Sequence, residues 1–170
     1  MAHLERVDVM ASMWLPDRPE RTRIGRLVEA AKDRGDDAAV ALLAQEAADW
    51  AAAPDGDTVV VPVPPSPDRP NRLVPAVADA LAARWQVPRA DLVERHGVTP
   101  RLRDLDPADR RGVAIAGDYR LATELDPSVA VVLVDDVILT GVTLEHVAGV
   151  VRAGGGRPVR AAVLARSRRA

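Results

Sequence analysis

The sequence predicts an α/β fold in which helices flank a parallel β-sheet. Short, mainly apolar runs recur at 58–63, 129–134 and 158–165. Such runs are typical of strands that are buried on both faces. Segments with helical spacing lie between them, and this alternation favours a parallel sheet of about four or five strands. We expect one domain over residues 1–170, with a small N-terminal helical hood over 1–55 and a core over 56–170.

The N-terminal third reads as two helices. Apolar residues at i, i+3, i+4 and i+7 from Ile24 to Ala31 predict the first helix, which the polar run at 33–37 ends. An alanine-rich helix follows at about 38–52, with Trp50 on its buried stripe. PDGD at 54–57 is a turn signal.

A buried strand is predicted at 58–63 because its residues are mainly β-branched and turn residues bound it. The prolines of PPSPDRPN at 64–71 exclude regular structure there. Asn71 is suited to cap the next helix, whose apolar spacing runs from Val74 to Trp85. Residues 88–94 are expected to form a short strand.

The second half begins with a long polar stretch. From His96 to Asp118 arginines and aspartates replace the apolar pattern, apart from a short helix expected near 107–111, and such long loops in compact domains are usually functional or disordered. A strand at 129–134 and a helix at 143–153 follow. Three glycines at 154–156 end that helix, and PVRAAVLA forms the last strand.

The most informative segment is VVLVDDVILTGVT at 131–143. Ligands of parallel sheets bind beyond the carboxyl ends of the strands, and Asp135 and Asp136 are placed at that edge. Buried carboxylates need partners, so hydroxyl groups, a divalent cation or arginines are expected close by. The residues from Thr140 to Thr143 open a helix, and their amides and hydroxyls suit an anion. Gly141 permits a tight turn beside Val142, so acids followed by a phosphate cradle predict a sugar-phosphate site.

Other site classes fit the segment less well. GxxxxGK[ST] and GxGxxG are both absent, which argues against a P-loop nucleotidase and a dinucleotide fold. A receiver-type acidic pair is expected near the start of its chain. The remaining alternative is a structural helix-capping turn that carries two aspartates without a ligand.

Composition excludes further classes. The chain has no cysteine, so disulfides and thiolate metal sites are excluded. No apolar run reaches the roughly 18 residues of a membrane span, and no signal peptide is recognisable, so we expect a cytoplasmic protein. The net charge of −2 and the scarcity of aromatic residues argue against direct nucleic-acid binding. Lys32 is the only lysine and is expected to mark a structural or hood segment.

The segment at 131–143 resembles the phosphoribosyl-pyrophosphate (PRPP) motif of type I phosphoribosyltransferases. More narrowly, the chain resembles the ComF family without its N-terminal zinc module. The similar segments are VEAAKDRGDDAAVALLAQEAADWAA (28–52), VVVPVPPSPDRPNRL (59–73) and LDPADRRGVAIAGDYRL (105–121).

This resemblance implies roles for individual residues. Asp135 and Asp136 would bind the ribose hydroxyls, and the residues from Thr140 to Thr143 the 5-phosphate. Arg69, in the loop after the 58–63 strand, would contact pyrophosphate, and the 96–118 loop would close as a lid. Mg²⁺ would arrive bound to PRPP.

Two function classes follow from the resemblance. One is an enzyme that transfers phosphoribosyl to a nitrogen nucleophile. The other is a non-catalytic protein that senses PRPP or a nucleotide, or one related to DNA uptake. With one tyrosine and no phenylalanine, a stacked base acceptor would have to use Tyr119, a tryptophan or aliphatic residues. A homodimer is common among similar proteins.

Overall fold

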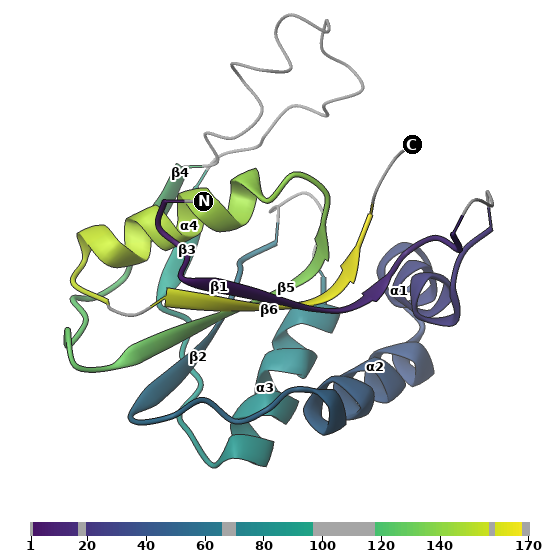
Figure 1. Cartoon of the computed structure of the whole chain (residues 1–170), viewed down its shortest axis with the longest axis horizontal. Coiled ribbons are helices and arrows are strands. Elements are labelled where there is room, and N and C mark those ends of the chain that lie inside the picture. The colour runs from purple at the N-terminus through teal and green to yellow at the C-terminus, as the bar shows by residue number, and fades with distance from the viewer. Residues whose placement is uncertain (1, 17–19, 66–70, 97–117, 157–158, 168–170) are drawn as a thin grey trace, which may run out of the picture.

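The computed structural model describes residues 2–16, 20–65, 71–96, 118–156 and 159–167 (Figure 1). Arg69 and most of the expected lid, residues 97–117, lie outside the described residues. Within the described ranges, no helix is long and apolar enough to cross a membrane.

Four parallel strands form the central sheet, in the order β1-β6-β5-β2. They are β1 (Arg6–Ser12), β2 (Thr58–Pro62), β5 (Ala130–Ile138) and β6 (Val159–Arg166). All five residues of β2 and most residues of β5 and β6 are buried, as expected for strands covered on both faces. The predicted α/β fold with a parallel sheet flanked by helices is confirmed.

Different elements cover the two faces of the sheet (Figure 1). One face carries α1 (Arg23–Asp33), α2 (Asp37–Trp50) and α3 (Leu73–Trp85). The other carries α4 (Val142–Ala153) and an antiparallel hairpin of β3 (Val93–His96) and β4 (Asp118–Leu121). Two apolar clusters therefore fill the molecule, one on each side of the sheet.

The N-terminal segment contains a strand that the sequence analysis does not place. β1 pairs in parallel with β6, from Arg6 opposite Arg160 to Ser12 opposite Arg166. Its charged residues alternate with valines and the strand lies at the edge of the sheet, so it lacks a continuous apolar run. The described part of residues 1–55 therefore contains an edge strand in addition to the two predicted helices.

Other boundaries also differ from the prediction. β3 begins at Val93, so the short strand lies later than 88–94. Trp50, expected on a buried stripe, is 37% exposed at the end of α2. β5 continues to Ile138, and its last residues extend past Pro62, the last residue of β2 that pairs with β5.

Candidate functional site

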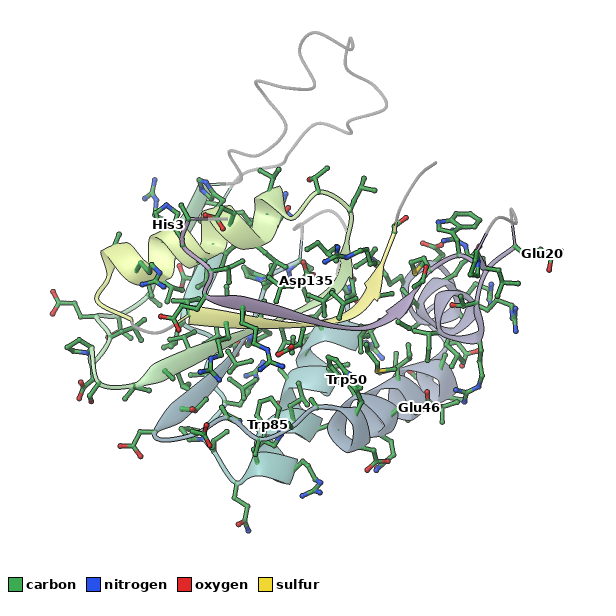
Figure 2. All side chains as sticks on the ribbon, in the orientation of Figure 1. His3, Glu20, Glu46, Trp50, Trp85 and Asp135 are labelled. Carbon is green, nitrogen blue, oxygen red and sulfur yellow. The ribbon has the colours of Figure 1, made fainter. Side chains whose placement is uncertain are left out.

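The two aspartates lie inside the last half of β5, not after it. Successive residues of a strand point to opposite faces. Val132 and Val134 pack in the cluster on the α1–α3 side, whereas Val131 and Leu133 pack in the cluster on the α4 side. By this alternation Asp136 faces α1 and α3, and Asp135 faces α4 and the hairpin. Figure 2 shows Asp135 on the α4 side, and Trp50 and Trp85 across the sheet.

Asp136 is buried and has two polar partners from distant parts of the chain. It is 6% exposed. The Lys32 Nζ lies 2.7 Å from its Oδ2, and the Asn71 Nδ2 donates to the same oxygen at 2.6 Å. An ionised carboxylate at this depth requires such compensation.

Asn71 and Lys32 are both held in place by the ends of helices. The Asn71 Oδ1 accepts a hydrogen bond of 2.8 Å from the amide of Leu73, the first residue of α3. The N-cap residue of α3 is Arg72, which makes no side-chain cap hydrogen bond, so the capping role predicted for Asn71 is wrong by one position. Asn71 instead fixes the turn just before the helix, and its side-chain nitrogen reaches Asp136. Lys32 lies in the last turn of α1, where a cation also suits the helix dipole.

The start of α1 is tied to the end of β1, which fixes the helix that carries Lys32. The Thr22 hydroxyl accepts from the Gly25 amide at 2.9 Å and donates to the Ser12 carbonyl at 2.6 Å. A Cβ at Gly25 would stand 2.2 Å from the Met13 carbonyl oxygen, so only glycine allows this close approach.

Asp135 lies in a less compensated environment. Burial, and secondarily the charge of Asp136, raise its pKa to about 7, and a hydrogen bond from the Asp136 amide and the charge of Lys32 oppose the shift. That hydrogen bond, from the Asp136 amide to the Asp135 Oδ1, is 2.8 Å long. Asp135 can therefore exchange a proton near neutral pH.

Tyr119 borders this side of the acid pair. It is 7% exposed, and its ring packs against His146 at 5.7 Å between centroids. The Arg95 guanidinium lies 5.4 Å from the Tyr119 ring centroid. Burial raises the pKa of Tyr119, the charge of Arg95 lowers it and that of Asp135 raises it. Tyr119 is therefore a core residue, and its ring is not exposed for stacking against a base.

The turn after β5 exposes the groups expected to bind phosphate. Gly141 has φ of +82°, a left-handed conformation that favours glycine, and precedes the first residue of α4. Within the described residues no acceptor is recorded for the amides of Val142, Thr143 and Leu144, the first turn of α4. The side chains of Thr140 and Thr143 are exposed. The turn therefore presents free amides and two hydroxyls at the carboxyl edge.

The structure brings most of the predicted site residues together. Asp135, Asp136 and the residues from Thr140 to Thr143 form one strand–turn–helix. Lys32 joins them although it was expected to be structural, and Asn71 joins them although only its capping role was foreseen. The clue in the sequence was that Lys32 is the only lysine among 23 basic residues.

The described cavities do not include the acid pair. One of about 370 Å³ lies between α1 and α2. Another of about 280 Å³ is bordered by Arg6 and Arg160, near the amino ends of their strands, and by both Trp50 and Trp85. Among the described residues, no group of three or more His, Asp or Glu side chains is arranged to hold a metal ion.

Comparisons with known proteins give likenesses of fold. No family model and no curated protein sequence matches the chain. A structure of the allosteric regulatory enzyme of purine biosynthesis aligns with a TM-score of 0.48 at 19% identity, over 73% of this chain and 25% of that one. The glutamine PRPP amidotransferase from B. subtilis, complexed with ADP and GMP, aligns with a TM-score of 0.48 at 20% identity, over 73% and 25% of the chains. The present chain spans about a quarter of the length of these two proteins.

A smaller protein is matched over more of its length. The adenine phosphoribosyl transferase from Trypanosoma brucei, in complex with AMP, pyrophosphate and ribose-5-phosphate, aligns with a TM-score of 0.42 at 14% identity, over 93% of this chain and 74% of that one. These likenesses concern the arrangement of strands and helices and assign no role to any residue. None of them connects the chain to the ComF family.

Proposed function

We propose that this protein binds PRPP together with Mg²⁺ and transfers its 5-phosphoribosyl group to a nitrogen nucleophile, releasing pyrophosphate. The observation that carries the proposal is the continuous segment from Asp135 to Thr143. It places two carboxylates and a turn of free amides at one edge of the sheet. Few ligands need hydroxyl acceptors and an anion cradle so close together, and a ribose 5-phosphate needs both.

Each half of the segment suits a different part of the ligand. The carboxylates of Asp135 and Asp136 accept hydrogen bonds from the ribose hydroxyls. The amides from Val142 to Leu144, with the hydroxyls of Thr140 and Thr143, hold the phosphate at the positive end of the dipole of α4. No lysine or arginine is required at the phosphate itself.

Mg²⁺ that arrives bound to PRPP is compatible with the carboxylates of Asp135 and Asp136. Mg²⁺ is commonly held by one or two carboxylates together with substrate phosphates. The Oδ2 of Asp135 accepts no hydrogen bond from the described residues, so one carboxylate oxygen could be shared with such an ion. When bound, the ion would neutralise the charge of the leaving pyrophosphate.

In this reaction the acceptor nitrogen attacks C1 of the ribose, so the protein positions the reacting groups and supplies no nucleophile of its own. The bond from C1 of the ribose to the pyrophosphate oxygen breaks, a bond from C1 to nitrogen forms, and the nitrogen loses a proton. Positive charge develops on the sugar in between, so a carboxylate near the ring stabilises it electrostatically. Positioning and exclusion of water supply the rest of the acceleration.

A second candidate is a protein that binds the same ligands without turnover. It is favoured by the phosphate turn itself, where Leu139 is 54% exposed and Val142 37% exposed. Exposed apolar side chains beside a binding turn suit contact with another protein. Tyr119, the aromatic residue that borders Asp135, is buried and offers no stacking surface for an acceptor base.

Calorimetric titration of PRPP with Mg²⁺ tests the site. We expect binding by the wild type and none by the variant that combines Asp135→Asn with Asp136→Asn. Asp8→Asn is the matched control, because Asp8 is also a strand aspartate but pairs with Arg6 on β1. Unchanged affinity in the double variant would place the ligand elsewhere, and no binding by the wild type would refute the proposal.

Two further measurements separate the candidates and test Arg69. Pyrophosphate release in the presence of amine and base acceptors distinguishes the transferase from the sensor. Arg69→Ala is expected to weaken PRPP more than ribose 5-phosphate, because only PRPP carries pyrophosphate. Equal losses would remove Arg69 from the pyrophosphate site.

A further inference from the structure

Lys32 is the exception in a chain that otherwise uses arginine for every basic residue. There are 23 lysine and arginine residues, and 22 of them are arginine. The single lysine contacts the most buried acid among the described residues, Asp136. The question is which property of lysine, absent from arginine, matters at position 32.

The contact geometry uses one oxygen of the carboxylate. The Lys32 Nζ and the Asn71 Nδ2 lie 2.7 Å and 2.6 Å from the Oδ2 of Asp136. The other oxygen, Oδ1, accepts no hydrogen bond from the described residues. Two donors therefore anchor Oδ2, which leaves Oδ1 as the oxygen that could accept from a ligand.

An ammonium group suits this arrangement better than a guanidinium group. Lysine presents a compact point charge, which leaves room for the Asn71 amide at the same oxygen. Arginine presents a planar fork that matches both oxygens of a carboxylate at once. An arginine at position 32 would compete with Asn71 for Oδ2 or occupy Oδ1.

We infer that Lys32 is a positioning residue of the candidate site: with Asn71 it anchors Asp136 through Oδ2 and thereby keeps Oδ1 free for a ribose hydroxyl. The inference rests on the proposed function for the identity of the ligand. It assigns to α1 a part in the site that is otherwise built from β5 and α4. Lys32 acts through Asp136 and does not itself touch the reacting atoms.

The same lysine acts on the neighbouring acid at longer range. The charges that act on Asp135 are those of Asp136 on β5 and Lys32 on α1. The charge of Lys32 favours the ionised form of Asp135.

Binding measurements on three variants of α1 test the anchor. Lys32→Arg keeps the charge but engages both oxygens, so we expect about tenfold weaker binding of PRPP with Mg²⁺. Lys32→Met loses the anchor and the charge and should weaken binding at least as much. Arg23→Lys is the control, because Arg23 lies on the same helix and pairs with Glu46 instead, with one contact of 2.9 Å. The control is expected to bind as the wild type does.

A measurement without ligand keeps this inference separate from the proposed function. The carboxyl ¹³C signal of Asp136 should shift in Lys32→Met and should stay as in the wild type in Arg23→Lys. ¹⁵N-lysine labelling adds a single side-chain signal, that of Lys32, which Asp136→Asn should shift. If the wild type fails to bind PRPP but these shifts occur, the ligand is wrong and the anchor stands.

Two results would overturn the inference. One is wild-type affinity in Lys32→Arg, which would mean that the open oxygen of Asp136 is not used. The other is a Lys32 side-chain ¹⁵N signal that does not change in a folded Asp136→Asn protein, which would mean that Lys32 does not contact Asp136. Thermal unfolding of each variant establishes that the folded state is being compared.

Discussion

The two faces of β5 surround an aspartate in different ways. On the side of α1 and α3, Asp136 is buried against an ammonium group and a side-chain amide. On the side of α4, Asp135 accepts a hydrogen bond from the Asp136 amide and lies close enough to Tyr119 to affect its pKa. Two identical residues, adjacent in the chain, therefore have different chemistry: one has compensated charge and the other titrates near neutral pH. Strand alternation makes this division possible because it sends neighbours into separate layers.

Asp135→Asn should produce the largest effect, and it should stabilise the protein. Burial and Asp136 raise the pKa of Asp135 from 3.8 to about 7. Between these values the unfolded chain loses the proton that the folded protein keeps, so wild-type stability falls as pH rises through this window. Asparagine cannot ionise, so the variant should gain about 2–4 kcal/mol in free energy of unfolding at pH 8 and little at pH 4. Urea unfolding at both pH values checks this, and a gain that is the same at both would contradict it.

Asp136→Asn should have the opposite sign. It removes the ion pair with Lys32, whose side chain is 35% exposed and so partly rehydrates. We expect a loss of about 2 kcal/mol in free energy of unfolding, below the cost of breaking a fully buried pair. Asp8→Asn provides the contrast, because its exposed pair with Arg6 should contribute little. If the substitutions at 135 and 136 act alike, the comparison between the two faces fails.

Gly141→Ala tests the turn that joins the two halves of the site. An alanine at φ of +82° is strained, which should cost about 1 kcal/mol or slightly more. Gly149→Ala, within the same helix, should be neutral or stabilising, since alanine favours helices and the nearest group is the flexible His3 side chain. Thermal denaturation of the two variants measures the difference. Equal effects would mean that the left-handed turn is not strained by a side chain.

Thr143→Val should have the smallest effect on stability. The side chain is exposed and its hydroxyl has no hydrogen-bond partner among the described residues, so the free energy of unfolding should change by less than about 0.5 kcal/mol. Binding of ribose 5-phosphate should nevertheless weaken several-fold, because one donor to the phosphate is lost. A calorimetric titration that finds no change would remove this hydroxyl from the phosphate cradle.

Local signals in the sequence account for the core of the fold and for half of the site. The mainly apolar runs indicate β2, β5 and β6. The Asp-Asp and Thr-Gly-Val-Thr patterns lie on one continuous segment, so their residues had to be neighbours. Lys32 could not be placed in this way because it lies 104 positions before Asp136 along the chain. Only the packing of α1 against the sheet brings the two together. β1 was not predicted because it is an edge strand. Fewer of its residues need to be apolar, so it lacks the continuous apolar run that marks the buried strands.

The pairing of β1 with β6 bears on how the protein is made. Arg6 lies opposite Arg160, so this edge of the sheet joins segments that are 154 residues apart. β1 leaves the ribosome first among the described strands and has no sheet partner until β6 has followed. Closing so long a loop is slow and is repaid only late in folding. Because Ser12 and Met13, at the end of β1, hold the start of α1, we expect Lys32 to reach Asp136 among the last events of folding, after the strand that bears the acids is already paired.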